Sequence, residues 1–158
     1  MAPRTILLMR HAEKPDDPTS PYLSDAGRDR AEKLAQYIPA TYGKPDFVFA
    51  AAEHQKSIRS YLTMKPLCDT IAVPLDSTTP AKDYQALATT LLSDDIYAAR
   101  LVAVCWPHGE LPALCGALGA RQGDYPDPWD SSVFDLILQL DYTSNDAPPG
   151  VTRVNEPF

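Results

Sequence analysis

The sequence predicts a three-layer α/β/α sandwich around a mostly parallel central sheet. Continuous apolar runs at residues 6–9, 47–50 and 101–105 are typical of strands that are buried on both faces. Segments with the helical spacing of apolar residues separate these runs, and turn-forming residues lie between them. Strands that alternate with helices form mostly parallel sheets with helices on both faces, which is the predicted architecture.

The first third of the chain predicts a strand, a loop and a helix. Residues 15–22 contain several prolines and must form a loop after the first apolar run. Ser24 is a suitable N-cap for the helix that follows. The apolar residues of this helix recur at i, i+3, i+4 and i+7: Ala31, Leu34, Ala35 and Ile38.

The middle of the chain predicts a second strand, a helix and a short third strand. The strand spans residues 47–50, and Ile58, Leu62 and Leu67 then indicate a helix. Pro66 should kink or shorten this helix, because proline lacks the backbone donor and clashes with the preceding turn. The alternation over residues 71–75 is typical of a short strand.

The last part of the chain predicts two more helices and an edge strand. Helical spacing recurs over residues 84–92 and 111–118, on either side of the 101–105 strand. Residues 133–142 alternate apolar and polar side chains, which favours a half-exposed strand at a sheet edge. Residues 143–158 contain prolines and little periodicity, so we expect an irregular C-terminal tail.

Length, charge and cysteine content limit the possible functions. With 158 residues, 44% of them hydrophobic, the chain is expected to form a single domain over residues 1–158. A net charge of −7 disfavours binding to nucleic acid or to an anionic membrane. The three cysteines lie in apolar runs and are expected to be buried, reduced thiols rather than disulfides or metal ligands. No signal peptide or membrane span is predicted, so we expect a cytoplasmic protein.

Two histidines follow predicted strands of the sheet. His11 follows the first strand, and His108 follows the 101–105 strand. Ligands of such sheets bind at the carboxyl ends of the strands, where these histidines are expected to lie. Arg10 and Arg59 could join them. A neutral imidazole can attack phosphorus, while guanidinium groups offset the charge on the equatorial oxygens of the phosphoryl group.

Short motifs at these positions resemble those of the histidine phosphatase superfamily, which contains the cofactor-dependent phosphoglycerate mutases. The Arg-His-Gly motif of the family appears as Arg10-His11-Ala12, and its Leu-Ser/Thr-x-x-Gly-x-x-x-Ala motif spans residues 23–31. Its Arg-x-x-x-Thr motif spans residues 59–63, and its late His-Gly is His108-Gly109. The resemblance covers about residues 4–118 and implies a phosphoglycerate mutase-like fold, in which His11 is the nucleophile, Arg10 and Arg59 bind phosphate, and His108 is the second histidine of the pocket.

The resemblance leaves the proton donor open and includes two departures. Glu110, two residues after His108, is the preferred acid, with Asp83 and Glu13 as alternatives; Glu13 could instead pair with Lys14 or with an active-site arginine. Ala12 replaces the usual glycine, which should spare the chemistry if its φ is negative. Residues 50–53 replace the usual Ser-Ser-Pro and remove hydroxyl groups from the pocket.

These observations predict a phosphatase with no metal and no cofactor. It would hydrolyse a phosphorylated small molecule or a phosphoprotein through a phosphohistidine at His11. The alternative is a module of the same fold that binds phosphate or another anion without turnover. His54 is expected to lie in an exposed loop, and the loops around residues 15–22, 50–57 and 121–130 are expected to set the specificity.

Overall fold

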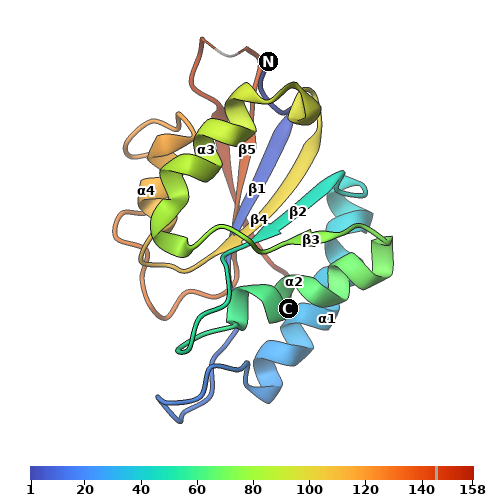
Figure 1. The fold of residues 1–158 in the computed structure, drawn as a ribbon, viewed down its shortest axis with the longest axis vertical. Helices are drawn as coiled ribbons and strands as arrows, with labels where there is room; N and C mark the ends of the chain where they lie inside the picture. Colours follow the sequence, from blue (N-terminus) through green and yellow to red (C-terminus); the bar gives the residue numbers. More distant parts are fainter. Residues whose placement is uncertain (145) are drawn as a thin grey trace.

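The computed structural model describes residues 1–144 and 146–158, which form a six-stranded sheet with helices on both faces. Figure 1 shows α1 and α2 on one face of the sheet and α3 and α4 on the other. The predicted α/β/α layers are therefore confirmed. The strands are β1 (Thr5–Arg10), β2 (Phe47–Ala50), β3 (Leu75–Asp76), β4 (Leu101–Trp106), β5 (Leu136–Asp141) and β6 (Gly150–Asn155). The helices are α1 (Asp25–Tyr42), α2 (Arg59–Ile71), α3 (Tyr84–Ser93) and α4 (Leu111–Ala117), with short 3₁₀ turns at Ala81–Asp83 and Asp95–Tyr97.

The strand order is β3-β2-β4-β1-β5-β6, with a parallel part and an antiparallel part. Strands β3, β2, β4 and β1 pair in parallel, and β5 and β6 are antiparallel additions beside β1. The prediction that residues 133–142 form the sheet edge was wrong, because β5 lies between β1 and β6. The edge strand is β6, in the segment predicted to be irregular. Its residues are exposed or half-buried, so it shows no apolar run.

The sheet separates two apolar cores. Leu8, Val104 and Leu138 belong to the core beneath α3 and α4, and Met9, Cys105 and Ile137 belong to the core beneath α1 and α2. Successive residues of a strand point to opposite faces, so strands covered on both faces need the continuous apolar runs seen in the sequence. Cys68, Cys105 and Cys115 are buried and unbonded, as predicted.

Helix α1 begins as predicted, whereas helix α2 is longer than predicted. Helix α1 begins after Ser24, whose side chain accepts a hydrogen bond from the backbone N–H of Gly27, as a capping serine does. Helix α2 passes through Pro66 and ends at Ile71, so the expected shortening at this proline was wrong. Residue 71 therefore belongs to a helix, and the predicted strand at 71–75 is reduced to the two residues of β3.

Within residues 1–144 and 146–158, no helix combines the length and the apolar character that crossing a membrane requires.

Candidate active site

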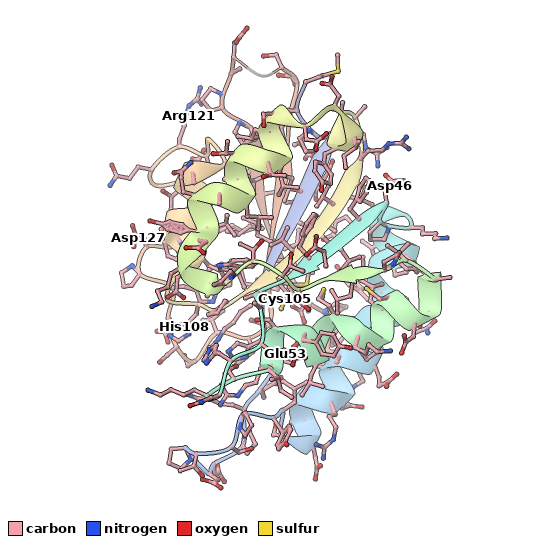
Figure 2. All side chains as sticks on the ribbon, viewed as in Figure 1. Asp46, Glu53, Cys105, His108, Arg121 and Asp127 are labelled. Atoms are coloured by element: carbon pink, nitrogen blue, oxygen red, sulfur yellow. The ribbon has the colours of Figure 1, made fainter. Side chains whose placement is uncertain are left out.

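The predicted site residues lie where the parallel strands end. His11 directly follows β1, and His108 comes two residues after β4. These two strands are hydrogen-bonded neighbours, with Arg10 opposite Trp106 in the ladder. Arg59 is the first residue of α2, which follows β2. Figure 2 shows His108 beyond the carboxyl end of the sheet.

The His11 ring is held in one tautomer. Its Nδ1 lies 2.7 Å from the carbonyl oxygen of Ala12, and a carbonyl can only accept, so Nδ1 carries the proton. The side chain is buried, with 5% of the residue exposed. Burial lowers the pKa of His11 to about 4, and the nearby charges of Arg10, Arg59 and His108 act in the same direction. At pH 7 the ring is therefore neutral, with a lone pair on Nε2.

Arg10 is buried against the segment before β5. Its Nη1 donates to the carbonyl oxygen of Ser131 over 2.6 Å, and its guanidinium carbon lies 3.9 Å from the centroid of the Phe134 ring. Burial and the charge of Arg59 lower the pKa of Arg10 to about 10, which leaves it a cation at neutral pH. Its Nε is buried and has no hydrogen-bond partner among the described residues. Arg10 thus keeps one N–H that no described protein group accepts.

Arg59 connects the pocket to the proline-rich loop. Its Nε donates to the carbonyl oxygen of Tyr22 over 3.1 Å, and its Nη2 donates to that of Ser20 over 2.7 Å. Burial lowers its pKa. The position of Arg59 is fixed by Thr63, whose hydroxyl donates to the Arg59 carbonyl oxygen and accepts from the backbone N–H of Ala12. Thr63 thereby joins the start of α2 to the segment that carries His11.

The start of α1 fixes the chain just after His11. The backbone N–H and the hydroxyl of Ser24 both approach the carbonyl oxygen of Glu13, at 2.9 and 3.2 Å. A Cβ at Gly27 would lie 2.3 Å from the same oxygen, so only glycine fits here. Ala12 is not among the residues with positive φ, so the condition for replacing the usual glycine is met.

His108 lines an open cavity and lies close enough to Arg10 for the charge of that guanidinium to act on the imidazole. Burial lowers its pKa, and the charges of Arg10 and Lys14 lower it further. The cavity, of about 410 Å³, is lined by His108, Tyr125, Asp127 and Trp129 together with residues of α4. The 121–130 loop, for which the sequence predicted only a role in specificity, therefore forms one wall beside the site.

The three candidate acids have different surroundings. Both carboxylate oxygens of Glu13 accept hydrogen bonds from Arg30, at 2.9 and 3.2 Å, so its predicted pairing with Lys14 or an active-site arginine was wrong. Glu110 is half-buried at the N-cap of α4, one residue before the helix in which it was predicted. Asp83 is exposed at the end of a 3₁₀ turn.

Sequence reasoning missed Ser131, Phe134 and Arg30. Ser131 and Phe134 contact Arg10 from more than 120 positions along the chain, and no short motif marks them. Arg30 does fall inside a recognised motif, at a position that the motif leaves unspecified. His54 is exposed in a turn closed by hydrogen bonds to Ser57, as expected. In the part of the chain that the structure describes, no three His, Cys, Asp or Glu side chains are grouped as metal ligands would be.

No protein-family model matches this chain, and no curated protein matches its sequence. Solved structures do match it over nearly its whole length. The structure of the protein histidine phosphatase SixA complexed with tungstate covers 96% of both chains, with a TM-score of 0.70 and 16% identity. The chain has the fold of the histidine phosphatase superfamily. The predicted phosphoglycerate mutase-like fold is therefore confirmed.

Other proteins whose solved structures match this chain are named for different activities. A mycobacterial glucosyl-3-phosphoglycerate phosphatase with inorganic phosphate matches 98% of this chain and 96% of its own, with a TM-score of 0.58 and 14% identity. A phosphoglycerate mutase from Plasmodium falciparum matches 94% of this chain and 87% of its own, with a TM-score of 0.60 and 15% identity. These activities belong to those proteins, and at such identities the likeness establishes the fold alone.

Proposed function

We propose that this chain is a phosphatase that hydrolyses a phosphomonoester or a phosphoprotein, without a metal, through a phosphohistidine at His11. The observation that carries the proposal is the state of the His11 ring. It is neutral at pH 7, its Nδ1 is engaged by the Ala12 carbonyl, and its Nε2 keeps a lone pair beside Arg10 and Arg59. A neutral ring with an unprotonated Nε2 close to two guanidinium groups is what attack on phosphorus requires.

In the first step, Nε2 of His11 attacks phosphorus and the bond from phosphorus to the leaving oxygen breaks. Its electron pair goes to that oxygen. Arg10, His108 and the Nη1 of Arg59, which is not engaged by Ser20 or Tyr22, donate hydrogen bonds to the equatorial phosphoryl oxygens, where charge accumulates. The Arg10 Nε, buried without a protein partner among the described residues, is one such donor. The products are a phosphohistidine and the leaving group.

A proton must reach the leaving oxygen, and water must then remove the phosphoryl group. We assign the proton to Glu110, because Glu13 is engaged by Arg30 and Asp83 is exposed. In the second step the carboxylate takes a proton from water, the water oxygen attacks phosphorus, and the bond between nitrogen and phosphorus breaks. The cavity beside His108 is large enough to hold the leaving side of the substrate.

The test is substitution of His11. His11→Ala should reduce hydrolysis of 4-nitrophenyl phosphate by at least about a thousandfold, because the nucleophile is lost. The folded state is checked by circular dichroism, and His54→Ala is the matched control, since His54 is exposed in a turn. Equal activity of His11→Ala and the wild type would contradict the proposal.

The alternative is a phosphate-binding module without turnover. It is supported by the hydrogen bonds that Arg59 donates to Ser20 and Tyr22, because these donors are not free for a phosphoryl group. Brief incubation with a labelled phosphodonor separates the two functions. An acid-labile, alkali-stable label on His11 indicates an enzyme. Phosphate binding without a covalent label indicates a module.

A further inference from the structure

Arg30 joins the segment after His11 to the C-terminal part of the chain. Its Nε and Nη2 donate to the two carboxylate oxygens of Glu13, and its Nη1 donates to Glu156 Oε1 over 2.8 Å. The same Nη1 lies 3.2 Å from the carbonyl oxygen of Phe158. The Arg30 side chain is 14% exposed and that of Glu156 only 1%, while that of Glu13 is 27% exposed, so the network is buried on its Glu156 side and partly open at Glu13.

The network holds Arg30 from several sides. The Phe158 ring lies 5.6 Å from the Arg30 guanidinium carbon and packs edge-on against Tyr37 of α1. The backbone N–H of Glu156 donates to the Asp135 carbonyl oxygen over 2.7 Å, which anchors this end of the chain to the residue before β5. Glu156 and Phe158 therefore contact the same guanidinium that binds Glu13.

The Glu13 carboxylate places a negative charge close to His11 and Arg10. Glu13 lies two residues after His11, and its charge is close enough to Arg10 to act on the pKa of that guanidinium. The backbone of Glu13 is fixed by Ser24 and Gly27, so only its side chain is free to choose a direction. Released from Arg30, it would turn toward the nearest cations of the pocket and compete there with a phosphate anion.

We propose that Arg30 is a positioning residue that keeps the Glu13 carboxylate out of the phosphate pocket, and that Glu156 and Phe158 hold Arg30 in place for this purpose. The proposal rests on the proposed function only in that the pocket binds phosphate. It assigns a role in anion affinity to residues of the C-terminal segment, which lie outside every recognised motif.

The test is phosphate affinity in variants of Arg30 and Glu13, measured by isothermal titration calorimetry with inorganic phosphate. Arg30→Met should weaken binding about tenfold, because it leaves an unpaired carboxylate near Arg10. Adding Glu13→Gln to Arg30→Met should restore the affinity to within about twofold of the wild type. A purely structural role of Arg30 would not be rescued in this way. Arg28→Met is the matched control, since it removes a positive charge from the same helix at an exposed position that pairs with Asp25.

Unchanged phosphate affinity in Arg30→Met, or no recovery in the double variant, would overturn the proposal. Urea unfolding of each variant establishes that it is folded. If Arg30→Met does not fold, Arg30→Lys replaces it, with an expected loss of about threefold that Glu13→Gln again recovers. Turnover of 4-nitrophenyl phosphate is measured separately. Failure of the proposed phosphatase function would appear there, while the calorimetric comparison would still decide the role of Arg30.

Discussion

At the scale of single residues, burial sets the protonation states of the side chains in the candidate site. Burial keeps His11 neutral, and a single backbone carbonyl fixes which nitrogen carries the proton. Arg10 remains a cation although only 2% of the residue is exposed. Its charge is retained because an aromatic face and a carbonyl oxygen replace part of the water it has lost.

Phe134 tests this view of Arg10. Phe134→Leu keeps an apolar side chain but removes the aromatic face beneath the guanidinium, so we expect kcat/KM for an aryl phosphate to fall about 3- to 30-fold. The same loss should appear in the affinity for inorganic phosphate, since Arg10 is proposed to bind it. Phe47→Leu is the matched control, because Phe47 packs against Tyr97 at the other end of β2. Equal losses in the two variants would contradict the role of Phe134.

At the scale of elements, the N-terminal parts of α1 and α2 hold the segment that follows β1. Thr63 of α2 binds the Ala12 amide, and Ser24, the N-cap of α1, binds the Glu13 carbonyl. Several residues of the recognised motifs therefore hold the two helices against residues 12–13. Few of their positions would contact a substrate.

Gly27 makes the contact between α1 and this segment testable. Gly27→Ala places a Cβ 2.3 Å from the Glu13 carbonyl oxygen, and backbone atoms must move apart to accommodate it. We expect the free energy of unfolding to fall by about 1–3 kcal/mol in urea titrations. Gly150→Ala is the control, because a Cβ there would meet no atom within 4 Å. A stability equal to that of the control would show that the helix start is not constrained by this contact.

The sequence predicts the elements that bury apolar surface and misses those that depend on a partner. The runs at β1, β2 and β4 are apolar because both faces of the sheet are covered, so local composition reveals them. Strand β6 has one paired side and exposed residues, and it exists because β5 offers it hydrogen bonds. The effect of Pro66 on the length of α2 was overestimated, because packing of α2 on α1 and the sheet outweighs the loss of one backbone hydrogen bond.

The candidate site divides in the same way. His11, Arg10, Arg59 and His108 could be predicted as site residues because they stand at strand and helix ends, within short motifs. The contacts that prepare them could not be found, since Arg10 to Phe134 and Arg30 to Glu156 join distant parts of the chain. Such pairings follow from the placement of β5 and β6, which local periodicity does not determine.

At the scale of the whole molecule, two buried groups give stability opposite dependences on pH. The pKa of His11 falls from 6.5 to about 4 on folding, so between these values the unfolded chain binds the proton and stability rises with pH. Burial raises the pKa of Glu156 from 4.5 to about 7, although Arg30 opposes the shift. Over that range the folded chain binds the proton, and stability falls as pH rises. The two contributions offset each other over much of this interval.

Single substitutions should reveal each contribution. Between pH 4.5 and 6.5, the unfolding free energy of His11→Asn should fall by about 1–3 kcal/mol relative to that of the wild type. That of Glu156→Gln should rise by a similar amount over the same range. Urea titrations at the two pH values measure both. Parallel changes in the two variants would contradict the assignment of opposite signs.

The burial of the cysteines affects how readily this protein is oxidised. Burial raises the pKa of Cys105 to about 12 and that of Cys115 to about 12, so neither forms appreciable thiolate at neutral pH. Peroxide attacks thiolates, and the proposed nucleophile is an imidazole. The proposed reaction through His11 would therefore not depend on a reducing environment, unlike one whose chemistry rests on an exposed sulfur.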